Sequence, residues 1–443
     1  MATRVLVLGA GVAGESFVAA LRRLDPKFEI TIVEQELVGG ECSYWACIPS
    51  KTLLRPLELA HRSRLAPGAA EAVRDVDPKR VFWWRDQVAG KDDTSQAEWV
   101  VKQGAELVRG HADVVEPGRV RVDGREVEYD HLLVATGSTP AVPPVDGLDE
   151  IDFWSSREGT SVDEVPDSLI VLGGGAVGVE LAQFYARIGA HVTIVQNGDH
   201  LLPRVDREAG DLIAEVLRKD GVDVRLGLTA ARVSRDDSRL RVELADGQEL
   251  EAAQLLVATG RRPNIEGLGL EKLDVHLEKQ GLVVDERMSA GDRVWGAGDV
   301  TGVALFTHVG KYQARIAAVN VAGGDARADY RAIPAAVFTD PQVAMVGETS
   351  GEGAVSACWS VEKVSRAATY ARPKYPGFVK LFADRDRGVL VGAVVVGPEA
   401  GEWLGQLTLA IRAEVPVSVL RDTIQPFPTF SEAIFFAARE LDL

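Results

Sequence analysis

A glycine-rich turn between a buried strand and a helix occurs twice in this chain and restricts the fold more than any other feature. The first copy is Gly9-Ala10-Gly11-Val12-Ala13-Gly14, between the apolar run Arg4 to Leu8 and a helical stretch, Glu15 to Leu24. Such glycines let the backbone approach a pyrophosphate at the helix N-terminus. Glu34, which ends the next apolar run from Glu29, can accept hydrogen bonds from ribose hydroxyls. The sequence therefore predicts a β-α-β unit that binds a dinucleotide.

The second copy predicts a second nucleotide. Gly173-Gly174-Gly175-Ala176-Val177-Gly178 follows the strand Ser168 to Leu172, and precedes a helix, Val179 to Ile188, and a strand, His191 to Gln196. Two near-repeats support the duplication. His131 to Gly137 and Gln254 to Gly260 are apolar strands that each end in Ala-Thr-Gly, and each would close one nucleotide domain.

Cys42 and Cys47 follow directly on the first β-α-β unit. In an ideal helix, Cα atoms five residues apart are separated by about 8 to 9 Å, whereas a disulfide spans roughly 4.4 to 6.8 Å. A bridge therefore requires an irregular first helical turn, and Pro49 fits one. Partial positive charge at a helix start also stabilises a thiolate, which is the reactive form of cysteine. The alternative is two free structural thiols.

The run from Gly39 to Lys51, Gly-Gly-Glu-Cys-Ser-Tyr-Trp-Ala-Cys-Ile-Pro-Ser-Lys, lies between the two glycine turns. This combination resembles the FAD-dependent pyridine nucleotide-disulfide oxidoreductases, which include dihydrolipoamide dehydrogenase, glutathione reductase and mercuric reductase. The resemblance covers nearly the whole chain. It implies an α/β fold with two Rossmann-like domains, for FAD and NAD(P), and a C-terminal α+β dimerisation domain. We expect an FAD domain at 1–147 and 269–332, an NAD(P) domain at 148–268 and an interface domain at 333–443.

The resemblance also assigns roles to residues. It makes Cys47 the thiol nearer the flavin and Cys42 the outer thiol that exchanges with substrate. Lys51 would lie near the reactive flavin nitrogen and pair with Glu180. A helix beginning near Phe306 to His308 would point at the flavin, with His308 structural. The expected cofactor-binding residues are Gly9, Gly11, Gly14, Glu34, Gly40, Lys51, Ala135, Thr136, Gly137, Asp299, Gly173, Gly175, Val177, Gly178, Gln196 and Gly260, with Asp299 on the ribityl chain.

One departure from the family controls the substrate question. The family's C-terminal His-x-His-Pro-Thr segment supplies an acid/base histidine, but Phe427 occupies that position here and no histidine follows His308. Glu432, which would orient the histidine, is left to solvent or to a helix cap. Positioned proton transfer is typically worth about 10² to 10⁴ in rate. Glu41 replaces a family threonine, and we have no functional account of it.

The leading hypothesis is therefore an NAD(P)H oxidoreductase that passes electrons through FAD and the Cys42–Cys47 pair to a quinone or an activated disulfide. The alternatives are dihydrolipoamide dehydrogenase or a low-molecular-weight disulfide reductase, a metal-ion reductase of the mercuric type, and a non-enzymatic redox-sensing flavoprotein. The sequence favours a metal-ion reductase less, because there is no cysteine pair among the last residues to pass a soft metal inward. Tyr44 and Trp45 either line a pocket for a flat substrate or pack in the core.

The choice between NADPH and NADH rests on Gln196. A carboxylate at the end of the second strand favours NAD, and arginines favour the 2′-phosphate of NADP. The neutral Gln196, with Arg204 further on, favours NADPH slightly.

The composition and charge of the chain limit the classes of partner and the cellular compartment that we expect. A net charge of −17 argues against nucleic acid or an anionic membrane. No apolar run approaches the roughly 18 residues that span a bilayer, and residues 1–20 have no secretory pattern. Three cysteines fit a reducing compartment. We expect a cytoplasmic homodimer that acts on a small-molecule acceptor and has no metal site.

Overall fold

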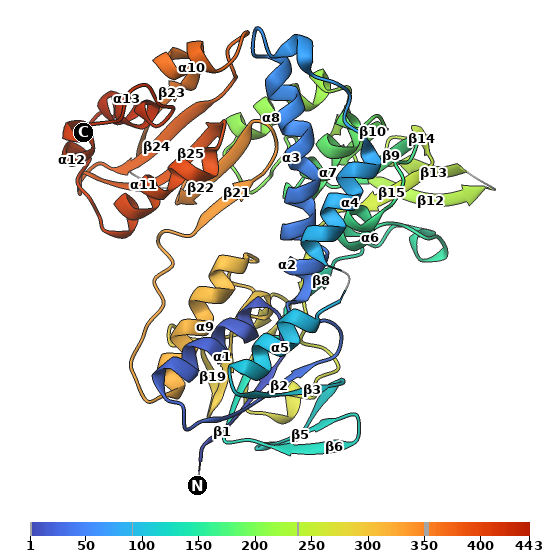
Figure 1. Ribbon diagram of the computed structural model, residues 1–443, viewed down its shortest axis with the longest axis vertical. Helices are drawn as coiled ribbons and strands as arrows, with labels where there is room; N and C mark the ends of the chain where they lie inside the picture. Colours follow the sequence, from blue (N-terminus) through green and yellow to red (C-terminus); the bar gives the residue numbers. More distant parts are fainter. Residues whose placement is uncertain (1, 91, 237–238, 350–353) are drawn as a thin grey trace. The chain divides into compact units, whose positions relative to one another are not determined.

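The computed structural model describes residues 2–90, 92–236, 239–349 and 354–443, which form two units (Figure 1). The first unit comprises residues 1–49, 86–141 and 261–329, and the second comprises 50–85, 142–260 and 330–443. Each unit therefore combines three separate stretches of chain. The division falls within two helices, α3 (Cys47–Arg64) and α4 (Pro78–Ala89).

The first unit is built on a six-stranded sheet in the order β19-β20-β7-β1-β2-β3. Its strands are β1 (Arg4–Leu8), β2 (Glu29–Glu34), β3 (Ala105–Arg109), β7 (His131–Val134), β19 (Ser289–Gly291) and β20 (Val294–Gly296). The central pairs are parallel, and β1 is apolar on both faces, as a strand covered on both sides must be. The helices α1 (Val12–Leu24) and α9 (Thr307–Val321) pack against each other.

Smaller elements complete the first unit. They are the antiparallel sheet β4 (Ala112–Glu116), β5 (Arg119–Val122) and β6 (Arg125–Glu128), the strand pairs β8 (Ser138–Pro140) with β16 (Arg261–Pro263) and β17 (Leu277–Glu278) with β18 (Gly281–Leu282), and the helices α2 (Gly40–Tyr44) and α5 (Thr94–Lys102). The pairing of β8 with β16 brings residues more than 120 positions apart into register.

The second unit contains the second glycine turn in a four-stranded parallel sheet, in the order β11-β10-β9-β15. Its elements are β9 (Ser168–Leu172), α7 (Ala176–Arg187), β10 (His191–Gln196), α8 (Arg207–Lys219), β11 (Asp223–Leu226) and β15 (Gln254–Val257), with α6 (Ser156–Ser161) before them and the antiparallel strands β12 (Ala230–Asp236), β13 (Arg239–Leu244) and β14 (Glu249–Ala252) inserted. In both glycine-turn repeats the helix begins inside the glycine motif, at Val12 and Ala176, which is earlier than the apolar pattern indicated; Gly11 and Gly175 are the N-cap residues.

A five-stranded antiparallel sheet in the order β21-β22-β25-β24-β23 forms the C-terminal part of the second unit. Its strands are β21 (Pro334–Val337), β22 (Gln342–Gly347), β23 (Ala354–Ser360), β24 (Phe378–Asp384) and β25 (Val389–Gly397), and its helices are α10 (Ser365–Tyr370), α11 (Ala400–Arg412), α12 (Val417–Asp422) and α13 (Glu432–Glu440). The helices α11 and α13 pack on this sheet.

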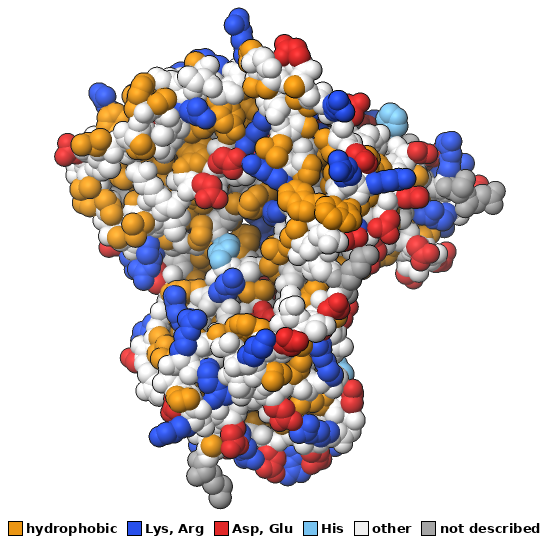
Figure 2. All heavy atoms as spheres, in the orientation of Figure 1, with side chains coloured by type: hydrophobic (Ala, Val, Ile, Leu, Met, Phe, Trp, Pro, Cys, Tyr) orange, Lys and Arg blue, Asp and Glu red, His pale blue; other side chains and the backbone are white. Residues whose placement is uncertain are grey.

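Several large apolar side chains of this C-terminal part are exposed: Leu409, Val419, Ile424 and Phe427. Figure 2 shows hydrophobic side chains gathered over the region that Figure 1 draws in orange and red. In the described part of the chain, no helix has the length and apolar character needed to cross a membrane.

Candidate functional site

The first glycine turn has the geometry of a pyrophosphate cradle. A Cβ atom at Gly9 would lie 2.4 Å from the Ala135 carbonyl oxygen, and one at Gly14 would lie 2.1 Å from the Gly9 oxygen, so both positions must be glycine. A Cβ at Gly11 would meet no atom nearer than 3.9 Å, so this glycine leaves open space at the N-terminus of α1. These residues fit a bound dinucleotide.

Several other residues expected to bind FAD lie around this turn. Glu34 Oε2 accepts a hydrogen bond from the Ala10 N–H at 2.8 Å, which fixes its carboxylate beside the turn. A Cβ at Gly40 would lie 3.0 Å from the Gly11 Cα, so the start of α2 also approaches the cradle. The Ala135-Thr136-Gly137 segment leaves β7 here, and Thr136 Oγ1 donates to the Asn264 carbonyl at 2.7 Å.

The second glycine turn repeats this geometry. A Cβ at Gly173 would lie 2.5 Å from the Ala258 oxygen, and one at Gly178 would lie 2.0 Å from the Gly173 oxygen, whereas a Cβ at Gly175 meets nothing within 4 Å. Val177, between them, is partly exposed at the first turn of α7. Gly260 follows β15 with a φ of +139°, a backbone conformation that favours glycine.

Gln196 takes the place of Glu34 in this second turn. Its Oε1 accepts a hydrogen bond from the Gly174 N–H at 2.8 Å. Gln196 is buried, and its NH₂ is a donor that the carboxylate of Glu34 lacks. A donor suits a phosphate oxygen, whereas the carboxylate of Glu34 suits ribose hydroxyls.

Cys42 and Cys47 lie on different helices. Helix α2 ends at Tyr44, and α3 begins at Cys47, so the chain is irregular between the two thiols, as a bridge requires. Both are free thiols in the structure. Interaction with the neighbouring Cys47 thiol and burial raise the pKa of Cys42.

Thr307 contacts both sulfur atoms. Its Oγ1 lies 3.2 Å from Cys42 Sγ and 3.4 Å from Cys47 Sγ. It is the first residue of α9, which begins where the sequence indicated, so the partial positive charge of the helix start is directed at the thiols. The hydroxyl of Thr307 and the ammonium of Lys311, one turn further along α9, both lower the pKa of Cys42. Sequence analysis identified neither residue.

Glu41 belongs to a chain of polar contacts that sequence analysis also missed. Arg261 donates to Glu41 Oε2 at 2.9 Å and to Ser138 Oγ at 2.8 Å. Ser138 donates in turn to Asp299 Oδ2 at 2.6 Å. Asp299 is half-buried at the start of a 3₁₀ turn, and its partial removal from water raises its pKa. Arg261 therefore compensates the charge that Glu41 brings to this region.

Lys51 and Glu180 are paired in the second unit. Lys51 Nζ lies 2.8 Å from Glu180 Oε2, and the other carboxylate oxygen accepts the Phe338 N–H at 2.8 Å. The Phe338 ring faces the ammonium, with its centroid 4.9 Å from Nζ. Two contacts from Phe338, in the turn that joins β21 to β22, therefore hold the ion pair between α3 and α7.

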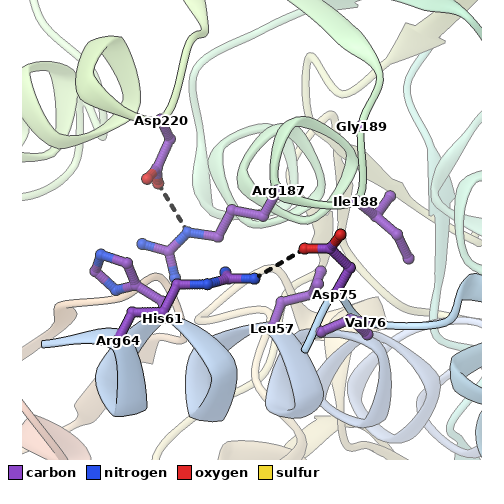
Figure 3. Close-up of a pocket in the computed structure, with 9 residues that line it drawn as sticks. All are labelled: Leu57, His61, Arg64, Asp75, Val76, Arg187, Ile188, Gly189 and Asp220. Carbon is purple, nitrogen blue, oxygen red and sulfur yellow. Dashed lines mark hydrogen bonds and ion pairs between the residues drawn. The ribbon is translucent and has the colours of Figure 1, made fainter. Parts of the chain in front are cut away.

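Asp340, in the same turn, anchors that segment to both helices. Its buried carboxylate accepts from Arg187 at 2.8 Å and Arg62 at 3.1 Å, and lies 2.7 Å from His61 Nδ1. Figure 3 shows the pocket beside this cluster, where Arg187 reaches Asp220 and Arg64 reaches Asp75. The charges that line the pocket are therefore matched to one another.

The side chains at or near the positions where this chain departs from the family differ in burial and in contacts. Tyr44 packs in the core, where its hydroxyl donates to the Val38 carbonyl at 2.9 Å, so it does not line a substrate pocket. The side chain of Phe427 is 73% exposed. Glu432 begins α13 and accepts the Thr429 N–H of the preceding loop at 3.4 Å, and α13 has no side-chain cap hydrogen bond at Ser431. His308 stacks on Phe306 with ring centroids 5.2 Å apart.

Comparison with known proteins agrees with this geometry over most of the chain. Residues 3–326 match the family described as pyridine nucleotide-disulphide oxidoreductase, and residues 333–438 match the dimerisation domain of that family. This chain belongs to that family. It is an FAD-dependent oxidoreductase that uses a pyridine nucleotide, and the glycine turns described above fit the two nucleotides. When bound, the flavin would accept hydride from the nicotinamide and pass the two electrons on to a disulfide, which becomes two thiols.

The relatives of this oxidoreductase act on different substrates. The chain is 36% identical to a mercuric reductase of Acidithiobacillus ferrooxidans, over 98% of this chain and 82% of that protein. It is also 36% identical to a dihydrolipoyl dehydrogenase of Thermus scotoductus, over 99% and 97% of the two chains. Among solved structures, the Cu(II) complex of the HOCl-induced flavoprotein disulfide reductase RclA from Escherichia coli has a TM-score of 0.86 and 27% identity, covering 99% of each chain.

Proposed function

We propose that this protein oxidises NADPH and passes the electrons through FAD and the Cys42–Cys47 pair to an acceptor that needs no positioned acid. The observation that carries the proposal is the arrangement of the two thiols. The Thr307 hydroxyl at the start of α9 contacts both sulfur atoms, at 3.2 Å from Cys42 Sγ and 3.4 Å from Cys47 Sγ. A helix start stabilises a thiolate, which is the form that attacks a disulfide or donates electrons.

Roles within this site follow from the family resemblance and from contacts of the chain. Cys47 acts beside the flavin, and Cys42 exchanges with the acceptor. Lys51 places a positive charge near the reactive flavin nitrogen, and Glu180 and Phe338 hold it there. We also propose that residues 1–147 and 269–332 form the FAD domain, 148–268 the NAD(P) domain and 333–443 the interface domain.

The replacement of the family histidine by Phe427 sets the acceptor class. A thiol leaving group of ordinary acidity departs slowly without a proton donor, because such a donor is worth about 10² to 10⁴ in rate. Quinones and activated disulfides need no such donor. We therefore propose a quinone or an activated disulfide as the acceptor, and lipoamide or glutathione-type disulfides as poor substrates.

We also propose NADPH over NADH, since the neutral Gln196 does not repel the 2′-phosphate as a carboxylate would. A homodimer fits the matched dimerisation domain and the apolar side chains exposed on it, including Ile424 at 94% exposure. A cytoplasmic location fits the free thiols of a reducing compartment.

Metal-ion reduction is the second candidate. It is favoured by two relatives, a mercuric reductase and a disulfide reductase solved as its Cu(II) complex. In this case a soft ion takes the thiolates of Cys42 and Cys47 as ligands, receives electrons that NADPH supplies through FAD, and leaves in a lower oxidation state. Among the described residues, no group of three or more His, Cys, Asp and Glu side chains is placed to hold a resident metal.

Steady-state oxidation of NADPH and NADH against a panel of acceptors tests these proposals. The panel contains lipoamide, glutathione disulfide, an activated aromatic disulfide, a quinone, Cu(II) and oxygen. Wild type should prefer the quinone or the activated disulfide, and Phe427→His should raise lipoamide turnover by up to about 10² while changing quinone turnover little. Lipoamide turnover at least as fast as quinone turnover in wild type, with no gain in Phe427→His, would contradict the proposed acceptor class. A preference for Cu(II) would select the second candidate.

A further inference from the structure

We propose that Thr307 is a catalytic residue that transfers a proton between the two thiols and so decides which sulfur is the thiolate. The inference rests on the proposed redox role of the Cys42–Cys47 pair. It addresses a problem that the pair creates: with phenylalanine at position 427, the family's acid/base histidine is missing, yet each sulfur must lose its proton at a different stage. The outer sulfur must be a thiolate to attack an acceptor, and the inner sulfur must be one to face the flavin.

The geometry suits a relay. The Thr307 hydroxyl lies 3.2 Å from Cys42 Sγ and 3.4 Å from Cys47 Sγ, both within hydrogen-bond range for sulfur. A hydroxyl carries one donor and two acceptor lone pairs, so it can donate to one sulfur while accepting from the other. The backbone of α9 fixes the position of Thr307, because this residue begins the helix.

The transfer conserves charge and electrons. In the reduced protein, one proton is shared between the two sulfur atoms. When Cys47 holds it, the Cys47 S–H donates to Thr307 Oγ1 while the threonine hydroxyl donates to the Cys42 thiolate. The S–H bond of Cys47 breaks as an O–H bond forms, and the original hydroxyl proton passes to Cys42. Thr307 is unchanged, Cys47 is now the thiolate, and the reverse transfer restores Cys42.

Other charged groups on the surrounding elements set the background for this exchange. Lys311 on α9 stabilises negative charge on Cys42, and burial places the pKa of Glu15 on α1 at about 7. Glu41, next to Cys42 on α2, is neutralised by Arg261 at 2.9 Å. His308 is the residue after Thr307, and its imidazole is therefore the rival acid/base group. Its ring stacks on Phe306. On α3 the charged residue nearest to Cys47 along the chain is Lys51.

Thr307→Val tests the relay, because valine keeps the shape of threonine and removes the hydroxyl. The holoenzyme is reduced with NADPH and treated with iodoacetamide between pH 6 and pH 10, and alkylation of Cys42 and of Cys47 is measured separately by peptide mass spectrometry. We expect Cys42 alkylation near pH 7 to slow by about tenfold, since a hydrogen bond to a charged group is lost. The midpoint for Cys42 should shift by about one pH unit.

Three controls separate chemistry from structure. Thr307→Ser restores a hydroxyl and should return Cys42 alkylation to within about twofold of wild type. Thr369→Val removes a helical hydroxyl that bonds only the Arg366 carbonyl and a neighbouring side chain, and should change nothing. His308→Gln should leave the alkylation profile in place. If Thr307→Val does not fold or bind FAD, Thr307→Ala, which only removes atoms, takes its place.

The relay is overturned if Thr307→Val or Thr307→Ala binds FAD and alkylates like wild type, or if His308→Gln moves the profile and Thr307→Val does not. A serine variant that behaves like the valine variant also overturns it. Failure of the proposed function would look different. In that case NADPH would release no new thiols in wild type, as counted with a chromogenic disulfide after denaturation.

Discussion

Lys51 Nζ lies 2.8 Å from Glu180 Oε2, and the second oxygen of that carboxylate accepts the Phe338 N–H. Glu180 is almost fully buried, and each of its carboxylate oxygens has a partner. Lys51 is 34% exposed, so water screens part of the interaction.

Glu180→Gln should break this ion pair while keeping the Phe338 contact. We expect a loss of about 1 to 2 kcal/mol in the free energy of unfolding, less than a fully buried pair would lose. Flavin reduction by NADPH should also slow, because Lys51 loses its orienting partner. Urea unfolding and stopped-flow absorbance measure the two effects. Glu98→Gln, in the exposed pair with Lys102, should cost less than about 0.5 kcal/mol. Equal losses in the two variants would count against a special role for Glu180.

Asp340→Asn tests the anchor that ties α3 and α7 to the C-terminal sheet. Removal of this buried charge leaves Arg187 and Arg62 without their shared partner, so we expect a loss of about 3 kcal/mol in the free energy of unfolding. Asp163→Asn removes an exposed partner of Arg85 and should have little effect. The measurement is chemical denaturation of both variants. A loss below about 1 kcal/mol for Asp340→Asn would show that the cluster is not an anchor.

Much of the scaffold could be predicted from the sequence because it is local. The strands β1, β2, β9 and β10 begin and end where the apolar runs do. The irregular turn between the cysteines followed from their spacing. The placement of Lys51 opposite Glu180 came from the family resemblance, since a periodicity argument cannot pair residues 129 positions apart.

The polar contacts that complete the site were not predictable in this way. The sequence alone indicated no role for Glu41, because its partner Arg261 lies 220 residues away and belongs to a strand pair that only the folded chain forms. Thr307 was overlooked because a threonine at a helix start carries no distinctive pattern. The signal available was its place at the predicted start of α9, where any hydroxyl would face the flavin side.

The pH dependence of stability should reveal Glu15. Burial raises its pKa from 4.5 to about 7, so the folded state prefers the protonated form. Below pH 4.5 the carboxyl of Glu15 is protonated in both the folded and the unfolded state, so it does not lower the free energy of unfolding. As the pH rises towards 7, ionisation favours the unfolded state and the free energy of unfolding falls. Between pH 4.5 and pH 8, wild type should therefore lose up to about 2 kcal/mol relative to Glu15→Gln.

The measurement for Glu15 is the free energy of unfolding of both proteins across this range. Glu29→Gln, at an exposed position of β2, provides the matched control and should follow wild type. Parallel curves for wild type and Glu15→Gln would mean that the carboxyl of Glu15 ionises normally.

Gln196→Glu should reverse the nucleotide preference. A carboxylate at this position repels the 2′-phosphate of NADPH and can accept from the ribose hydroxyls of NADH. We expect the ratio of kcat/KM for NADPH to that for NADH to fall by about tenfold or more. Gln280→Glu, at an exposed site, adds the same charge and should leave the ratio alone. An unchanged ratio in Gln196→Glu would remove the structural basis for proposing NADPH.

The most direct test of the account is the long-wavelength absorbance of the flavin during anaerobic reduction with two electrons. Wild type should develop a charge-transfer band as the Cys47 thiolate forms beside oxidised FAD. Cys47→Ser should show no such band under any condition. Cys42→Ser should show it before reduction, because Cys47 is then always a free thiol. If the spectra of both variants match that of wild type at every stage, Cys42 and Cys47 are not the redox pair.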